Sequence, residues 1–151
     1  MSWVNSIFSD GSKVFVSKAN PLSGDDISIR VRIKEDAPVK RVFFRYLRYG
    51  EETVLQMNKM KNIKGFNYYE VNIIIEALIT QYHFIIESED TTYFYNQKGA
   101  YENIITEDYD FRIIANFNDI KWVREGIFYQ IFVDRFFNGN TNNDVKDKEY
   151  S

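Results

Sequence analysis

Hydrophobic and polar side chains alternate strictly between residues 27 and 33. Aliphatic residues occupy the odd positions, and Ser28, Arg30 and Arg32 occupy the even ones. Because successive side chains of a β-strand point to opposite faces, this pattern predicts a strand with one buried face. No ten-residue stretch shows a competing helical spacing. The alternation recurs at residues 40–47, 53–57, 68–74, 81–87, 91–95 and 110–114.

Turn-forming residues separate these predicted strands. Each interval contains glycine, in most cases beside serine, aspartate or lysine, at residues 9–12, 23–26, 49–51, 64–65 and 98–99. About seven short strands with turns between them are typical of an antiparallel sandwich. The predicted fold class is therefore all-β, an immunoglobulin-like antiparallel β-sandwich over residues 1–115.

The pattern changes after residues 116–121, which we interpret as a linker. Residues 127–133 (Ile-Phe-Tyr-Gln-Ile-Phe-Val) are apolar on both faces. Strands of this kind belong to parallel sheets whose two faces are covered, rather than to an antiparallel sandwich. We therefore expect residues 122–151 to be the truncated beginning of a second unit.

Composition excludes several classes of function. The 151 residues include no cysteine and a single histidine, His83, and the formal net charge is −3. Disulfides, thiolate metal sites and cysteine nucleophiles are thus excluded, as is a metal site built from several histidines. The first residues lack the basic region and apolar run of a secretory signal, which favours a cytoplasmic protein. No apolar run reaches the length of a membrane helix, so no membrane partner is expected.

A longer motif follows the proposed linker. Residues 129–140 read Tyr-Gln-Ile-Phe-Val-Asp-Arg-Phe-Phe-Asn-Gly-Asn. This stretch resembles the start of the catalytic (β/α)8 barrel in the α-amylase family, glycoside hydrolase family 13, in the branch of neopullulanase, cyclomaltodextrinase and maltogenic amylase. Those enzymes carry a β-sandwich, carbohydrate-binding module family 34, before this strand. Val133 and Asn140 depart from the family pattern, where proline and aspartate are common.

Residues before the linker carry a weaker part of the same resemblance, at positions 24–32, 68–70 and 81–84. The resemblance implies the N-terminal module of an α-glucan-acting glycoside hydrolase, contributing to homodimerisation and, as a further expectation, to α-glucan binding. The expected ligands are maltooligosaccharides or cyclodextrins. The family's catalytic carboxylates lie on later barrel strands, so no catalytic residue is assigned in this chain. The alternative is a free-standing carbohydrate-binding or protein-interaction module.

An asparagine-rich segment follows the predicted barrel strand. Its amide and carboxylate oxygens are the hard ligands that Ca²⁺ prefers, and the resemblance implies calcium as a cofactor of the parent enzyme. Only one of the four is a carboxylate, so we expect weak or absent binding by this chain. The alternative is an asparagine-rich turn. The four residues are Asn138, Asn140, Asn143 and Asp144.

Aromatic residues are the candidate carbohydrate-binding residues, because glucose stacks its C–H faces on exposed rings. Alternation places Tyr68 opposite Tyr69, so Tyr68 is predicted to be the exposed one of the pair. The alternative is that these rings fill the sandwich core or pair across strands. The candidates are Trp3, Tyr46, Tyr68, Tyr93 and Tyr95.

Two other features, His83 and a basic stretch, are interpreted without a catalytic or ligand-binding role. His83 lies on the strand face opposite Tyr82 and Phe84, and no nucleophile-elbow motif accompanies it. We interpret it as a structural or surface residue.

Seven basic residues between positions 30 and 48 are interleaved with aromatic ones, a mixture that is typical of nucleic-acid-binding surfaces. The negative net charge favours solvated strand surfaces, so no nucleic-acid partner is predicted.

Overall fold

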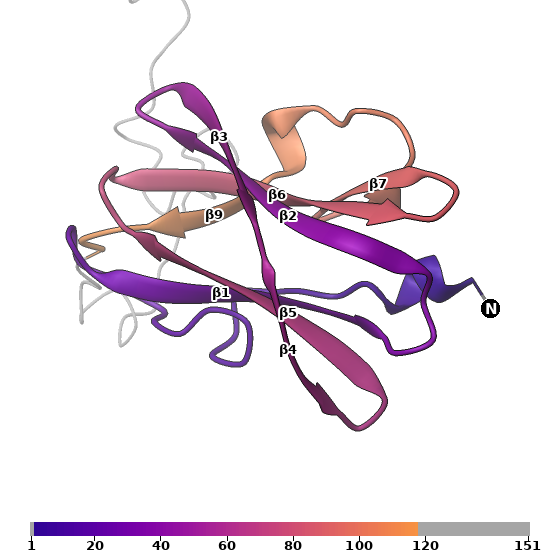
Figure 1. The fold of residues 1–151 in the computed structure, drawn as a ribbon. Helices are drawn as coiled ribbons and strands as arrows, with labels where there is room; N and C mark the ends of the chain where they lie inside the picture. The colour runs from indigo at the N-terminus through magenta and orange to yellow at the C-terminus, as the bar shows by residue number, and fades with distance from the viewer. Residues whose placement is uncertain (1, 118–151) are drawn as a thin grey trace, which may run out of the picture. The chain divides into compact units, whose positions relative to one another are not determined.

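A computed structural model describes residues 2–117, which belong to the first of two units in the chain, Met1–Asn118. These residues form nine strands and two short 3-10 helices, η1 (Trp3–Ser6) and η2 (Glu107–Tyr109). The strands pair antiparallel in two sheets that pack face to face (Figure 1). The predicted all-β sandwich is thus confirmed. No helix among the described residues could cross a membrane.

The smaller sheet has three strands in the order β1-β5-β4. They are β1 (Asp26–Lys34), β5 (Phe66–Ile74) and β4 (Asn58–Ile63). The larger sheet has the order β3-β2-β6-β7-β8. The β9 strand pairs with the first part of β6, which β7 does not reach. Its strands are β2 (Val39–Arg48), β3 (Glu51–Gln56), β6 (Ile79–Ser88), β7 (Thr92–Asn96), β8 (Gly99–Tyr101) and β9 (Phe111–Ile114).

The alternating stretches of the sequence coincide with seven of these strands, and two strands were not predicted. All six residues of β4 are exposed, so no alternation of buried and exposed positions is imposed on its sequence. The β8 strand has only three residues. Both lie at sheet edges, where packing constrains side chains least. The proposed boundaries at residues 115 and 121 remain predictions.

A continuous extended segment connects the two sheets along one side of the sandwich (Figure 1). It consists of β3, Met57 and β4, and we call residues 51–63 the side ribbon. Met57 is buried, and its backbone N–H donates to the carbonyl oxygen of Val42 at 2.8 Å. The ribbon is therefore anchored at its middle, while β3 and β4 each form the edge of a sheet.

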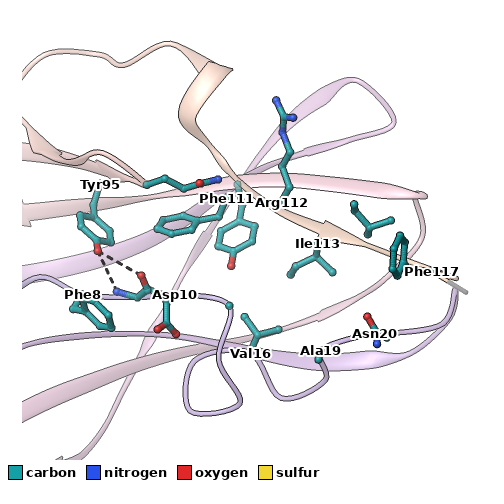
Figure 2. A pocket seen from close by; sticks show the side chains of 15 residues that line it. Phe8, Asp10, Val16, Ala19, Asn20, Tyr95, Phe111, Arg112, Ile113 and Phe117 are labelled. Atoms are coloured by element: carbon teal, nitrogen blue, oxygen red, sulfur yellow. Dashed lines mark hydrogen bonds between the residues drawn. The ribbon is translucent and has the colours of Figure 1, made fainter. Parts of the chain in front are cut away.

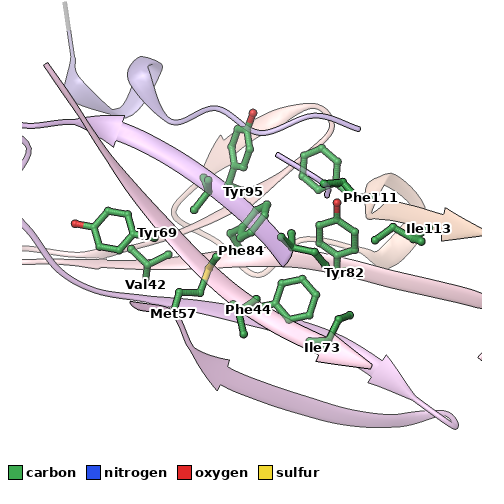
Figure 3. Packing of buried hydrophobic residues seen from close by; sticks show 14 of the residues in the cluster. Val42, Phe44, Met57, Tyr69, Ile73, Tyr82, Phe84, Tyr95, Phe111 and Ile113 are labelled. Carbon is green, nitrogen blue, oxygen red and sulfur yellow. The ribbon is translucent and has the colours of Figure 1, made fainter. Parts of the chain in front are cut away.

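The core lies between the sheets and is rich in aromatic rings (Figure 3). Phe44 and Phe84 are opposite each other on β2 and β6, and both are fully buried. The Phe84 ring also packs within about 6 Å, between centroids, of Tyr82 and Phe111. Aliphatic side chains from β1 and β5 close the core from the other sheet, among them Ile27, Ile29, Val31, Val71 and Ile73.

Burial of tyrosine phenols predicts sensitivity to alkaline pH. Burial raises the pKa of Tyr82 far above its ordinary value of 10.0, and burial also raises the pKa of Tyr69 and Tyr95. In the unfolded chain these phenols ionise near pH 10, so their contribution to stability is present below that pH and is lost as pH rises above it. Absorbance of tyrosinate during alkaline titration should show these phenols ionising together with unfolding. Ionisation near pH 10 in a folded chain would contradict the burial.

Candidate functional site

The segment before β1 runs across one open side of the sandwich. Residues 8–20, which we call the strap, bridge to β1 at two points, Phe8 to Arg32 and Val16 to Ile29. The Ser9 hydroxyl donates to the carbonyl oxygen of Arg30 at 2.7 Å. These bonds hold the strap near the sheets although it forms no long strand of its own.

A groove of about 610 Å³ lies between the strap and β9. Figure 2 shows Phe111 and Ile113 of β9 on one side and Phe8, Asp10 and Val16 of the strap on the other. We call it the strap groove. It is lined by Phe8, Ser9, Asp10, Gly11, Val16, Ala19, Asn20, Tyr82, Tyr95, Gln97, Phe111, Arg112, Ile113, Ile114 and Phe117. This volume falls within the range of about 300–1,000 Å³ that small-molecule sites occupy.

Exposed rings lie at the two ends of the strap groove. Phe8 is 38% exposed and Phe117 is 54% exposed, and Figure 2 shows them at opposite ends with the β9 residues between them. An exposed phenyl ring offers an apolar face on which the C–H face of a sugar or another planar group can stack. The groove therefore has two candidate stacking positions.

Polar groups stand between these rings. One oxygen of the Asp10 carboxylate accepts the Ser12 backbone N–H at 2.8 Å. Burial, together with the negative charge of Asp10, raises the pKa of Tyr82, so its phenol stays protonated at neutral pH. The exposed amide of Asn20 lies near Phe117 (Figure 2). Neutral hydroxyl and amide groups of this kind suit a polyhydroxyl ligand.

The described residues that line the strap groove do not include the pair of carboxylates that glycoside hydrolysis requires. Asp10 supplies the only carboxylate among the lining residues. Retaining hydrolysis uses two carboxyl groups, about 5–5.5 Å apart, as nucleophile and acid/base. The described lining of the strap groove is thus suited to binding a ligand rather than to cleaving a bond in it.

Tyr95 is one of the five candidates for sugar binding, and it is buried. The ring packs against Phe84 and Phe111, and the phenol oxygen accepts the Ser9 backbone N–H at 3.3 Å. Most of the ring is therefore engaged in core packing, and the role of Tyr95 in sugar binding stays a prediction. Its hydroxyl helps to hold the strap (Figure 2).

Trp3 and Tyr93 lie together, away from Tyr68. Their rings meet edge to face with centroids 5.3 Å apart, and both residues are half-buried. Tyr46 is also half-buried and packs on Phe44. Much of each ring is therefore engaged in packing, as the alternative interpretation held, and their role in sugar binding stays a prediction.

Tyr68 lies on the outer face of the smaller sheet and is more exposed than the buried Tyr69, as alternation predicted. Between the pairs Lys59–Tyr69 and Asn62–Asn67 the register shifts, so two residues of β4, Met60 and Lys61, stand opposite Tyr68. Such a bulge re-aims side chains. The result is a second groove of about 460 Å³, lined by Val14, Arg30, Met60, Lys61, Ile63 and Tyr68.

His83 is structural, as predicted. It is buried, and its Nδ1 lies 3.0 Å from an Asp110 carboxylate oxygen, while Arg45 approaches the other oxygen at 3.6 Å. Asp110 is fully buried. Arg45 also contacts the carboxylates of Glu52 and Glu107 at 3.0 and 2.7 Å. His83, Arg45 and Asp110, which we call the buried charge cluster, together with the exposed Glu52 and Glu107 attach the segment before β9 to the outer face of the larger sheet.

Other arginines of the basic stretch also have acidic partners. Glu70 pairs with Arg30, Glu87 with Arg41 and Glu76 with Arg48. These pairs neutralise part of the positive charge that a phosphate backbone would need.

The four predicted calcium ligands, Asn138, Asn140, Asn143 and Asp144, lie outside the described residues. Within residues 2–117 no group of three or more histidine, cysteine, aspartate or glutamate side chains could hold a metal ion. The predicted barrel strand at residues 127–133 also lies outside this range. Calcium binding and the barrel strand therefore remain predictions.

Of the residues that line the strap groove, sequence reasoning singled out Tyr95 but missed the exposed rings of Phe8 and Phe117. Phe8 and Phe117 lie outside the alternating stretches, so period-two patterns assign them to no face. The turn at residues 9–12 was recognised, but nothing in its sequence indicates that it folds back over β9. The available signal was an aromatic residue directly before the first turn and another shortly after the last strand.

Comparison with known proteins gives a consistent picture. The family model of the alpha amylase N-terminal ig-like domain matches residues 13–115. A maltogenic alpha-amylase from Bacillus acidopullulyticus is 27% identical over 136 residues, which cover 79% of this chain and 22% of that protein. An amylopullulanase from Thermoanaerobacterium thermosulfurigenes is 28% identical over 89 residues, covering 53% of this chain and 5% of that protein.

Solved structures share the fold. A cyclomaltodextrinase superposes with a TM-score of 0.64 at 22% identity, covering 96% of this chain and 26% of that one. At this identity the likeness establishes the fold alone. The chain spans about a quarter or less of these related proteins.

Proposed function

Since the chain belongs to the family of N-terminal immunoglobulin-like domains of alpha amylases, we propose that residues 2–117 are the non-catalytic module of an α-glucan-acting glycoside hydrolase. The related proteins are named as maltogenic amylase, amylopullulanase and cyclomaltodextrinase. The parent enzyme would hydrolyse α-glucans with residues beyond this module. The module itself contributes by binding and by assembly.

The observation that best supports sugar binding is the strap groove. It combines the exposed rings of Phe8 and Phe117 with the polar groups of Asp10 and Asn20. A maltooligosaccharide or cyclodextrin presents apolar ring faces and hydroxyl groups in the same ligand, and both find partners there. The groove around Tyr68 is the competing position, because there one ring lies among aliphatic side chains and Lys61.

Calorimetric titration with maltotriose tests this proposal and separates the two grooves. We expect weak, millimolar binding by the wild-type chain. Phe117→Ala removes one stacking face, worth about 0.5–1.5 kcal/mol, and should weaken binding by about twofold to tenfold. Tyr68→Ala, which removes a half-buried ring from the other groove, should leave binding unchanged.

The opposite pattern, with only Tyr68→Ala weakening the binding, would move the site to the outer face of the smaller sheet. Absence of heat with the wild-type chain at millimolar maltotriose would contradict sugar binding by the module. Unchanged far-ultraviolet circular dichroism would show that each variant remains folded.

A specific observation also favours dimerisation, the second proposed contribution. Among residues 2–117, β3 and β4 each form the outer edge of a sheet on the same side, where the side ribbon runs. Edge strands present free backbone N–H and C=O groups that pair readily with another chain.

A further inference from the structure

The strap contains an aspartate, Asp10, that directly precedes a glycine, Gly11. Every other aspartate or asparagine between residues 2 and 117 precedes a residue that carries a side chain. The backbone nitrogen after an aspartate can attack the side-chain carboxyl carbon and close a five-membered ring. A side chain on the following residue obstructs this approach, and glycine has none. Within this part of the chain, ring closure is therefore least hindered at Asp10.

Few contacts restrain the backbone at Gly11. Residues 11–14 are all exposed, and residues 9–14 belong to no strand or helix. Among the described residues, no group accepts a hydrogen bond from the Gly11 N–H. Exposed loops of this kind open at little cost in free energy. The Gly11 nitrogen can therefore turn toward the carboxyl group, and water can reach both.

The Asp10 side chain is already folded back along the chain. One of its carboxylate oxygens accepts the Ser12 backbone N–H at 2.8 Å, and the ring that this bond closes includes the Gly11 nitrogen. The bond must break before the carboxyl carbon can react. Because it is a single exposed hydrogen bond, it should slow ring closure by no more than about tenfold.

Backbone hydrogen bonds hold the strap on both sides of this position. The Phe8 N–H donates to the carbonyl oxygen of Arg32 at 3.0 Å, and the Arg32 N–H donates back to Phe8 at 2.9 Å. On the other side, the carbonyl oxygen of Phe15 accepts the Arg30 N–H at 2.8 Å. A change of covalent structure at Asp10 can therefore be absorbed between these anchors without unfolding the sandwich.

We propose that Asp10–Gly11 is a site of spontaneous isomerisation. The Gly11 nitrogen bonds to the Asp10 carboxyl carbon and closes a succinimide, and a water molecule leaves that contains the carboxyl hydroxyl and the amide hydrogen. A second water then opens the ring at either of its carbonyl groups. Breaking the new bond restores aspartate, whereas breaking the original peptide bond yields isoaspartate. Neither step oxidises or reduces any atom.

Isomerisation would remodel one wall of the strap groove. Figure 2 shows Asp10 on the strap side of this groove. In isoaspartate the main chain runs through the former side chain, so the turn gains a backbone atom and the carboxylate moves to the α-carbon. The Ser12 N–H then loses the acceptor geometry of the native turn. This inference does not depend on the proposed sugar binding, because the chemistry proceeds whether or not the groove holds a ligand.

Peptide mapping of the whole 151-residue chain tests the site. The folded chain is kept for several weeks at physiological temperature and then digested with trypsin, which releases residues 1–13 as one peptide. We expect a second peptide of unchanged mass that elutes separately and resists the protease that cleaves before aspartate. Its rate of formation should lie within about tenfold of the rate in the free peptide. Asn138–Gly139, outside the described residues, falls in a different tryptic peptide.

Two variants and an internal control isolate ring closure at this position. An added Cβ at Gly11 would meet no atom within 4 Å, so Gly11→Ala should keep the fold and slow the reaction several-fold. Asp10→Glu would require a six-membered ring and should abolish it. Asp36 is exposed in a turn but precedes Ala37, so it reports in the same sample what exposure alone produces, and we expect little isoaspartate there.

Incubation in water enriched in oxygen-18 gives an independent readout. Each opening of the succinimide leaves a heavy oxygen at residue 10, including when aspartate is restored. Absence of label and of isoaspartate in the folded chain, while the free peptide converts, would overturn the inference. Equal rates in Gly11→Ala and the wild type, or equal conversion at Asp36, would also refute a specific site.

The isomerised fraction shows whether the change stays local. Its backbone amide signals should differ from those of the original chain at residues 8–16 and remain unchanged along β5 and β6. Changes throughout those two strands would contradict the expectation that the strap anchors contain the effect.

Discussion

Replacing Phe84 with alanine should lower the free energy of unfolding by about 3–5 kcal/mol. Phe84 is fully buried, and its ring contacts Phe44 across the strands as well as Tyr82 and Phe111. The substitution leaves a cavity at the centre of the core, where rings from β2, β6 and β9 pack against one another and cannot close it completely. Urea denaturation followed by circular dichroism measures the loss.

The matched control is Phe117→Ala, because it deletes the same side chain at a position that is 54% exposed. We expect a change within about 0.5 kcal/mol there, as for most surface substitutions. Similar losses at both positions would contradict the assignment of Phe84 to the centre of the core.

Replacing Asp110 with alanine should be the other strongly destabilising change, costing about 3–5 kcal/mol. The Asp110 carboxylate is fully buried beside His83 and Arg45. Its loss leaves the His83 ring without its hydrogen-bond partner and the Arg45 guanidinium with less compensation in a dry environment. Asp108→Ala changes the same residue type at an exposed neighbouring position and should cost little.

A double-mutant cycle isolates the interaction within the buried charge cluster. In an Arg45→Met background no buried guanidinium is left with an incomplete set of partners, so Asp110→Ala should cost less than in the wild type. Denaturation of the four proteins gives the coupling energy. Additive effects of the two substitutions would show that Asp110 and Arg45 do not act together.

The fold followed from the sequence wherever burial imposed alternation. On β1 one face is enclosed by the core, so its aliphatic residues repeat every second position, and the same holds for β5 and β6. The β4 strand is exposed along its whole length, and its polar sequence carried no such signal. Local pattern therefore predicts strands that face a core but not strands that only close an edge.

The candidate site depended on contacts that local pattern does not encode. Alternation correctly distinguished Tyr68 from Tyr69. It placed Tyr93 and Tyr95 on one face but could not show that the strap and Phe111 enclose Tyr95. His83 was assigned to the correct face, yet its partners Arg45 and Asp110 come from elements far apart in the chain.

Nuclear magnetic resonance of the isotopically labelled chain during addition of maltotriose tests the central claim most directly, because one sample reports both binding and hydrolysis. We expect backbone amide signals to shift for residues 8–11, 19–20 and 111–117, which line the strap groove, while the sugar signals remain those of intact maltotriose. Unshifted amides at saturating sugar, or the appearance of glucose and maltose, would contradict a non-catalytic carbohydrate-binding module.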